Sequence, residues 1–199
     1  MSADDHPDRA ARSRVSSPGS GVGEPRPEPD LFTAYDELVG ATDPVMLVVT
    51  VTVADRRDGC LVGFHSQCGI EPRRHALWMS KANRTTRLVA DDRCRHVGVH
   101  LLRADQHELA RHFGTLTGDA VDKLEGVAVT DGPGGTPLLT GCTDRFVGRK
   151  LALTEADADH LCLTVEPIEV FRAGGRSFPQ WLRLSQVTDL VAGHPPDEL

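Results

Sequence analysis

The feature that most constrains the fold is a β-branched segment at residues 45–53, followed by a polar stretch and a second apolar segment. Valine, leucine and threonine dominate these residues, and Thr50 and Thr52 alternate with valines. This composition favours a strand. Residues 55–59, Asp-Arg-Arg-Asp-Gly, are typical of a turn, and residues 60–66 are expected to return as a second strand. The sequence therefore predicts an antiparallel hairpin.

Further segments have the same β-rich composition, and we expect strands at residues 76–79, 96–102, 146–153 and 160–171. The last two follow each other across an acidic turn at residues 157–159, which favours antiparallel pairing. Strands that come in hairpins, without a regular alternation of strands and helices, argue against a parallel sheet. The predicted fold class is mainly β (α+β), a closed or partly closed antiparallel barrel with a few short helices.

Short helices are expected where a capping residue precedes apolar residues at helical spacing. A helix that begins with Ser, Thr, Asp or Asn and carries Glu at its third residue has a capping box. The expected helices are residues 31–39 after Asp30, residues 84–89 after Asn83, and a helix that begins with a capping box of Asp105 and Glu108 and ends at Gly114.

Composition distinguishes the two ends of the chain from its middle. Residues 1–29 contain five of the 13 prolines and no aromatic residue, so they cannot bury enough surface to offset the entropy of ordering. We expect a disordered tail there and a folded domain over residues 30–175. Residues 176–199 are predicted to form a C-terminal extension whose last residues, from about Ala192, are disordered.

Charge and hydropathy argue against several classes of partner. The chain of 199 residues carries 29 acidic and 22 basic residues, a net charge of -7, which disfavours binding to nucleic acid or anionic lipid. The longest apolar run, residues 44–53, has about half the length needed to span a bilayer. The N-terminus has no apolar signal segment. We therefore expect a cytoplasmic protein with no nucleic-acid or membrane partner.

Metal and nucleotide motifs are also absent from the sequence. His107-Glu108 and His112 are one residue too far apart for the H-E-x-x-H motif, and the five cysteines form no C-x-x-C pair. We expect no metal site, and cysteines that are reduced and mostly buried. The glycine-rich residues 131–135 lack the flanking strand and helix of a dinucleotide loop and predict a turn. Neither a P-loop nor a G-x-S-x-G motif occurs.

Residues 80–86, Ser-Lys-Ala-Asn-Arg-Thr-Thr, follow an expected strand and lead into an expected helix. Hydroxyl groups, the Lys81 and Arg84 cations and the free amides of a helix start converge there, which favours binding of a phosphate. The alternative is an ordinary helix start with two solvated cations. Residues 63–72 offer amides and hydroxyls that suit the edge of a flat heteroaromatic ring, although a strand that runs into a loop would have a similar sequence.

Taken in order, these segments resemble the flavin reductase-like, FMN-binding split-barrel family. The resemblance begins with D-G-C-L-V-G-F-H-S-Q-C-G-I-E-P at residues 58–72 and W-M-S-K-A-N-R-T at residues 78–85. It covers about residues 32–171. Later landmarks follow in the family's order: residues 97–102, Ala104-Asp105-Gln106, Leu109-Ala110 with Phe113, Asp122-Lys123-Leu124, residues 135–139 and Ala158-Asp159-His160.

The chain departs from the family pattern at four positions. Arg73 stands where the family usually has a second proline, and Gly69 where it usually has a serine. Leu124 replaces a phenylalanine and Ala158 a glycine. These departures concern the flavin contacts and the access of the nicotinamide more than the fold.

The resemblance implies a Greek-key split β-barrel that works as a homodimer, with FMN, or alternatively FAD, bound near the subunit interface. It implies hydride transfer from NAD(P)H, a transient co-substrate, to the flavin, with His160 as the catalytic residue beside the flavin or nicotinamide. Alternatively, His160 is a strand-start histidine bonded to the Asp157 turn. The residues assigned to the phosphate are Ser80, Lys81, Asn83, Arg84 and Thr85, and those along the isoalloxazine are Phe64, His65, Ser66, Gln67 and Cys68.

Other functions remain open at this point. The chain is alternatively a flavin-binding module that serves a partner monooxygenase or another small oxidised molecule, with Arg73 and Arg74 suited to an anionic substrate. It is alternatively a split-barrel protein that has lost flavin and catalysis. The sequence does not distinguish NADH from NADPH.

Overall fold

The computed structural model describes residues 30–155, 157–173 and 180–193. The predicted tail, residues 1–29, and the last residues, 194–199, lie outside the described residues. The chain divides into two units, residues 1–42 and residues 43–199, and each is described by itself.

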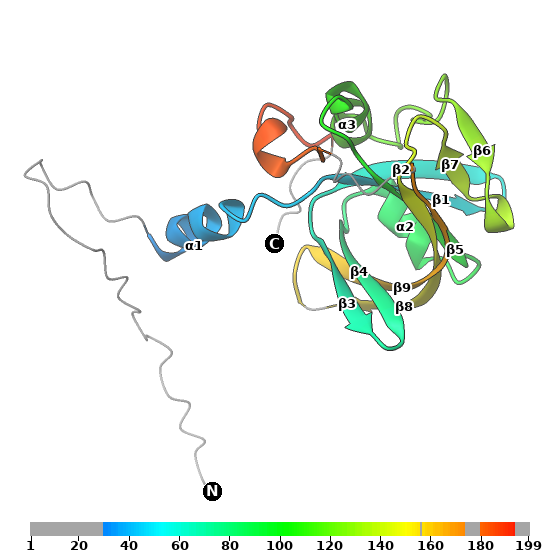
Figure 1. The fold of residues 1–199 in the computed structure, drawn as a ribbon, viewed down its shortest axis with the longest axis horizontal. Helices are drawn as coiled ribbons and strands as arrows, with labels where there is room; N and C mark the ends of the chain where they lie inside the picture. Colours follow the sequence, from blue (N-terminus) through cyan, green and yellow to red (C-terminus); the bar gives the residue numbers. More distant parts are fainter. Residues whose placement is uncertain (1–29, 156, 174–179, 194–199) are drawn as a thin grey trace, which may run out of the picture. The chain divides into compact units, whose positions relative to one another are not determined.

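In the first unit, the described residues form helix α1, Leu31–Gly40 (Figure 1). The Asp30 side chain caps it by accepting hydrogen bonds from the backbone amides of Phe32 and Thr33, both at 3.0 Å. An aspartate at this position satisfies amides that have no partner within the helix. The helix predicted after Asp30 is confirmed.

The second unit is built on a seven-stranded sheet in the order β2-β1-β5-β8-β9-β4-β3, with every neighbouring pair antiparallel. A small hairpin of β6 and β7 lies apart from it. The mainly β, antiparallel class is confirmed. The strands are β1 Leu47–Val53, β2 Arg56–Val62, β3 His65–Ile70, β4 Arg73–Ser80, β5 His96–Leu101, β6 Val129–Asp131, β7 Pro137–Leu139, β8 Arg145–Glu155 and β9 His160–Phe171.

Two local predictions along the first strands are wrong. Of the predicted turn at residues 55–59, Arg56 to Gly59 belong to β2 and pair with β1. The turn is made by Asp55 together with Ala54, which has a φ of 55°. The predicted strand at residues 60–66 breaks after Val62. The residues expected in a loop after Ser66 belong to β3. The polar sequence of β3 does not predict a strand, and its backbone hydrogen bonds are made by pairing with β4.

The helices of this unit keep their predicted places but differ in capping. Helix α2, Arg84–Ala90, begins after Asn83, whose side chain makes no capping hydrogen bond. Helix α3, His107–Thr115, begins after Gln106, so the predicted capping box of Asp105 and Glu108 is wrong. The Gln106 side chain accepts instead from the Arg103 amide at 2.9 Å. Helix α3 extends one residue beyond Gly114.

Strand β1 lies between two hydrophobic cores, which explains its nearly continuous apolar sequence. One face carries Leu47, Val49 and Val51 into a core that strands β2, β4, β5 and β9 share with α2. On the other face, Val48 packs in a core with α3, β7 and the C-terminal segment. Figure 1 shows the sheet curving around α2. The Thr50 hydroxyl, although buried, donates to the Pro137 carbonyl at 2.5 Å.

Residues 180–193, part of the predicted C-terminal extension, run along this second core as an ordered segment that we call the C-terminal segment. The Leu182 amide donates to the Leu102 carbonyl at 2.9 Å, and the Met46 amide donates to the Leu182 carbonyl at 2.8 Å. A 3-10 helix, η2, follows at Leu184–Gln186. These bonds hold the segment beside the end of β1.

The 3-10 helix η1, Pro133–Gly135, joins β6 to β7, so the glycine-rich stretch turns as predicted. Among the five cysteines, all free, Cys60, Cys94 and Cys142 are buried, Cys162 is half-buried and Cys68 is exposed. Across the described ranges, no helix is both long and apolar enough to cross a membrane.

Candidate functional site

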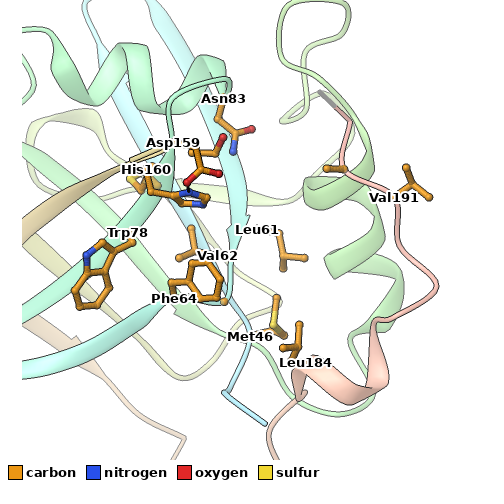
Figure 2. A pocket seen from close by; sticks show the side chains of 14 residues that line it. Met46, Leu61, Val62, Phe64, Trp78, Asn83, Asp159, His160, Leu184 and Val191 are labelled. Carbon is orange, nitrogen blue, oxygen red and sulfur yellow. Dashed lines mark hydrogen bonds and ion pairs between the residues drawn. The ribbon is translucent and has the colours of Figure 1, made fainter. Parts of the chain in front are cut away.

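A cavity of about 470 Å³ lies where β2 and β4 end, and we call it the outer cavity (Figure 2). This volume falls within the roughly 300–1,000 Å³ range of small-molecule and cofactor sites. Its walls come from the ends of β2 and β4, the start of β9, and the C-terminal segment. The lining residues are Met46, Leu61, Val62, Gly63, Phe64, Trp78, Met79, Ser80, Asn83, Asp159, His160, Leu184, Val191 and Ala192.

Two aromatic side chains give the outer cavity its flat apolar surface. Phe64 lies between β2 and β3 and is 54% exposed, whereas Trp78 on β4 is 37% exposed. The Trp78 amide donates to the Phe64 carbonyl at 2.9 Å, which fixes the two residues relative to each other. Large exposed aromatic side chains at a cavity are suited to stacking against a planar ligand.

A polar edge faces these rings. His160 begins β9 opposite Ser80 at the end of β4, and its imidazole lies next to Phe64, with ring centroids 5.5 Å apart (Figure 2). His160 Nδ1 lies 2.7 Å from the Asp159 carboxylate, and this hydrogen bond lowers the pKa of Asp159. The carboxylate thereby orients the imidazole and leaves Nε2 as the nitrogen that faces away from it.

The hydrogen bond expected in the alternative role of His160, to the turn at residues 157–159, is present in the structure and is made to Asp159. Asp157 adopts a positive φ of 47° in the turn between β8 and β9, and it is Asp159 that the imidazole contacts. The Asp159 carbonyl accepts from the Lys81 amide at 2.9 Å. The turn is therefore joined to the segment that leads into α2.

The predicted phosphate residues divide between different surroundings. Ser80 and Asn83 line the outer cavity. Lys81 instead pairs with Glu155 on β8, and the Arg84 guanidinium donates to the Gly118 carbonyl at 2.9 Å. Thr85 is buried, and its hydroxyl has no hydrogen-bond partner among the described residues.

The residues predicted along the isoalloxazine are mostly placed elsewhere. Of the five, Phe64 lines the outer cavity, whereas the four residues from His65 to Cys68 lie on β3 outside it. His65 Nε2 donates to the Val45 carbonyl at 2.9 Å. The Ser66 hydroxyl contacts the Gln67 carbonyl at 3.2 Å, and the Gln67 side chain donates to the Gly69 carbonyl at 3.0 Å.

His65 also contacts His75 on the neighbouring strand. Their rings stack with centroids 5.4 Å apart, and His65 Nδ1 lies 3.2 Å from His75 Nε2. Because Nε2 of His65 donates to a carbonyl, its Nδ1 accepts from His75. Burial and the neighbouring imidazole lower the pKa of His75 to about 4, and burial lowers the pKa of His65 as well.

Several cavity residues escaped the sequence analysis. Trp78 shares a face of β4 with Ser80, two residues away, so strand periodicity could have indicated it once the strand was assigned. Asp159 could have been indicated by its position directly before His160. Leu184, Val191 and Ala192 carried no local signal, since their contribution depends on where the C-terminal segment packs.

A flavin fits the chemistry of these walls. Its tricyclic ring is flat and largely apolar with a polar edge, and the outer cavity presents Phe64 and Trp78 opposite hydroxyl, amide and imidazole groups. The unpartnered Thr85 hydroxyl adds a buried polar atom close to the start of α2. Within the described ranges, no group of three or more His, Cys, Asp or Glu side chains could hold a metal ion.

Comparison with known proteins places this site in a family. Residues 39–180 match the flavin reductase like domain. Over 143 residues, the chain is 31% identical to FMN reductase (NADH) SmoA of Agrobacterium fabrum, which covers 72% of this chain and 76% of that protein.

Solved structures share the fold. The NADH:FAD oxidoreductase of Streptomyces globisporus superposes with a TM-score of 0.63 at 22% identity, over 75% of this chain and 88% of that one. Nitrilotriacetate monooxygenase component B from Mycobacterium thermoresistibile gives a TM-score of 0.63 at 14% identity, over 73% of this chain and 78% of that one. Because the domain match spans most of the chain and includes the cavity residues of β2, β4 and β9, this protein belongs to the flavin reductase-like family.

Proposed function

We propose that the protein is an FMN oxidoreductase of the flavin reductase type, which transfers a hydride from NAD(P)H to a flavin in the outer cavity. One observation carries the proposal: Phe64, Trp78 and His160 form an aromatic and polar site inside the region that matches the family. The relative from Agrobacterium fabrum, an FMN reductase that uses NADH, supports the same activity. Within this reaction, NADH is the favoured donor.

Phe64 and Trp78 would hold the flavin ring, and its polar groups would contact the Ser80 hydroxyl and the Oδ1 atom of Asn83, which leaves Asn83 Nδ2 free. Bound flavin supplies the hydride-accepting chemistry. FMN is the proposed cofactor, and FAD is the alternative because the Streptomyces globisporus relative is an NADH:FAD oxidoreductase.

The phosphate is proposed to lie at the start of α2, with Lys81, Arg84 and Thr85 completing the group. Both cations now contact exposed or half-buried partners: Lys81 pairs with Glu155, and Arg84 donates to the Gly118 carbonyl. Exchange of such partners for a doubly charged phosphate is favourable, since charge-assisted hydrogen bonds are stronger than neutral ones. The amides at the helix start favour an anion in the same place.

His160 is the proposed catalytic residue of this site. Asp159 accepts from Nδ1 and keeps the imidazole beside the Phe64 ring. The imidazole then offers Nε2 to a ligand in the outer cavity. The neutral ring can accept there from the nicotinamide amide, and the protonated ring can donate to negative charge that develops on a reduced flavin. Asp159 acts through His160 as a positioning residue.

We further propose a split-barrel homodimer. β3 is an edge strand of the sheet, and large apolar side chains are exposed on β3 and at the end of β9: Ile70 at 79%, Val170 at 70% and Phe171 at 37%. An edge strand with exposed apolar residues is commonly covered by another chain. In such a dimer, the residues from His65 to Cys68 on β3 would approach the subunit interface, where the flavin is expected.

A second candidate function is delivery of reduced flavin to a partner monooxygenase. The structural similarity to a nitrilotriacetate monooxygenase component B favours it. The chemistry at the outer cavity is the same in both cases, and only the destination of the electrons differs. A cytoplasmic location is proposed with either function, because NAD(P)H is supplied there.

An absorbance spectrum of the purified protein, before and after NADH, tests the proposal. We expect the absorbance of bound FMN, and its bleaching by NADH under exclusion of oxygen. A colourless protein that does not take up added FMN or FAD would contradict a flavin site. Bound flavin that neither NADH nor NADPH bleaches would contradict the reductase and leave only a flavin-binding module.

A further inference from the structure

A second, smaller cavity of about 210 Å³ adjoins the outer cavity, and the proposed hydride transfer does not use it. We call it the inner cavity. The two cavities are neighbours because they share five lining residues: Met46, Leu61, Asn83, Leu184 and Ala192.

The remaining walls of the inner cavity are apolar. They come from α3, through Phe113 and Gly114, and from the C-terminal segment, through Val187 and Leu190. Phe113 and Val187 are nearly fully buried and belong to the second core. Among the described residues that line this cavity, none has a charged side chain. A charged ligand would therefore lose its hydration without gaining a partner, which is strongly unfavourable.

Four lining residues of the inner cavity lie in the C-terminal segment, beyond the family match. The family match ends at residue 180, whereas Leu184, Val187, Leu190 and Ala192 all follow it. The segment is held in place by backbone hydrogen bonds at both ends, from Leu182 to Leu102 at 2.9 Å and from Gly193 to Gly114 at 3.1 Å. Its apolar side chains consequently form a wall in a fixed position.

Asn83 supplies the polar group shared by both cavities. It stands directly before α2, where an asparagine side chain usually accepts from the helix amides, yet it makes no such bond. Figure 2 shows its amide at the edge of the outer cavity. An amide that does not cap its helix is available to donate through Nδ2 to an oxygen acceptor on a ligand.

We propose that the inner cavity binds an uncharged, one-ring compound with a single carbonyl oxygen, next to the flavin. The proposal rests on the proposed function, which assigns the flavin to the outer cavity. The apolar walls take the ring, and the Asn83 amide donates to the carbonyl. A volume of about 210 Å³ lies below the usual range for larger ligands and suits a single ring.

Calorimetric titration of the FMN-saturated protein tests this assignment with three probes. Acetophenone has the ring and the carbonyl, ethylbenzene has the same carbon skeleton without the oxygen, and benzoate carries a charge. We expect acetophenone to bind about fivefold more tightly than ethylbenzene, the scale of one neutral hydrogen bond. Benzoate is expected to bind at least about tenfold more weakly than acetophenone. Equal affinities for the three probes would overturn the proposal.

Variants test the place of binding. Asn83→Ala is expected to remove the preference for acetophenone over ethylbenzene, since it deletes the donor. Ala192→Phe, which adds a large side chain at a residue that lines both cavities, is expected to weaken acetophenone binding at least about tenfold. Thr188→Phe is the matched control, because Thr188 lies exposed in the same segment and lines neither cavity. Equal effects of the two phenylalanine variants would contradict the assignment.

Two readouts separate this proposal from the proposed function. Flavin content and its bleaching by NADH are recorded on the same sample, so failure of the reductase is seen as an unbleached spectrum. Failure of the inner-cavity proposal is seen as a bleachable flavin with no acetophenone binding. Displacement of FMN by acetophenone would also overturn the inner-cavity proposal, because it would show that the flavin and acetophenone compete for the same space.

Discussion

The buried His100 imidazole accepts a hydrogen bond from the Leu139 backbone amide through Nε2, at 3.1 Å. Its other nitrogen, Nδ1, lies 3.1 Å from the Val48 carbonyl and must donate to it. This pair of bonds joins β7 to the β1–β5 part of the sheet and requires the neutral imidazole. Burial lowers the pKa of His100 to about 4.

The first prediction is a loss of stability in mild acid. His100 has an unfolded-state pKa of about 6.5 and a folded-state pKa of about 4. Its contribution is therefore fully present above pH 6.5 and is lost as the pH falls toward 4, by up to about 3 kcal/mol. Urea unfolding at pH 7.5, 5.5 and 4.5 measures it. The pKa of His75 is also lowered to about 4, so His75 adds to the same loss of stability as the pH falls.

His100→Gln isolates the contribution of this residue, because glutamine can donate and accept without titrating. We expect the variant to lose less stability than the wild type between pH 7.5 and 4.5. His75→Gln serves as the comparison for the half-buried pair. An identical pH dependence in His100→Gln and wild type would show that His100 is not the buried neutral group described.

A second prediction concerns the ion pair of Lys123 and Asp58, which lie 3.6 Å apart with side chains 1% and 0% exposed. Lys123→Met leaves a buried carboxylate without its cation, and we expect the free energy of unfolding to fall by about 3–5 kcal/mol. The double variant Asp58→Leu with Lys123→Met should recover part of this loss. Urea unfolding near pH 7.5 measures both.

The matched control is an exposed pair of the same charges. Arg87 contacts Asp119 at 2.5 Å, but both side chains are more than half exposed. Arg87→Met is expected to cost about 1 kcal/mol or less, since solvent screens exposed pairs. If Arg87→Met and Lys123→Met lowered the free energy of unfolding by similar amounts, burial would not explain the effect of Lys123→Met.

The third prediction separates catalysis from binding at His160. His160→Ala should slow flavin reduction by NADH more than about tenfold, about 1.4 kcal/mol in the barrier, while FMN affinity stays nearly unchanged. Asp159→Asn should slow reduction less, because it disturbs only the orientation of the imidazole. Rapid-mixing absorbance at the flavin band measures the rates, and a thermal melt of each variant checks the fold. An unchanged reduction rate with a lowered melting temperature would leave His160 a structural role only.

The fourth prediction concerns Arg84, whose guanidinium now donates to the Gly118 carbonyl at 2.9 Å. If it turns to the flavin phosphate, Arg84→Ala should weaken FMN binding by about 1.5–3 kcal/mol, the scale of a lost charge-assisted hydrogen bond. Riboflavin, which has no phosphate, should bind almost as before. Fluorescence titration with both ligands decides the matter, and an equal loss for both would exclude a phosphate contact by Arg84.

The sequence alone determined the positions of the long strands, the helix after Asp30, the turn at residues 131–135 and the family. Composition and periodicity suffice for these, because a β-branched run such as β1 or a capped apolar stripe such as α1 is a local property. The family was identified from motifs that are each a local property of the sequence, taken in their order along the chain. Even so, β3 was missed, because its polar residues become a strand only through pairing with β4.

Only the tertiary structure decided which candidate residues meet. The end of β4 brings Trp78 and Ser80 to the outer cavity, whereas Lys81, just after the strand, pairs with Glu155. The Asn83 side chain does not cap its helix. Leu184 lines the outer cavity together with Asn83, although the two residues are some hundred positions apart in the sequence. Such contacts depend on packing between distant segments, and no local pattern encodes them. The site is therefore a product of the fold, while the elements that carry it are properties of the sequence.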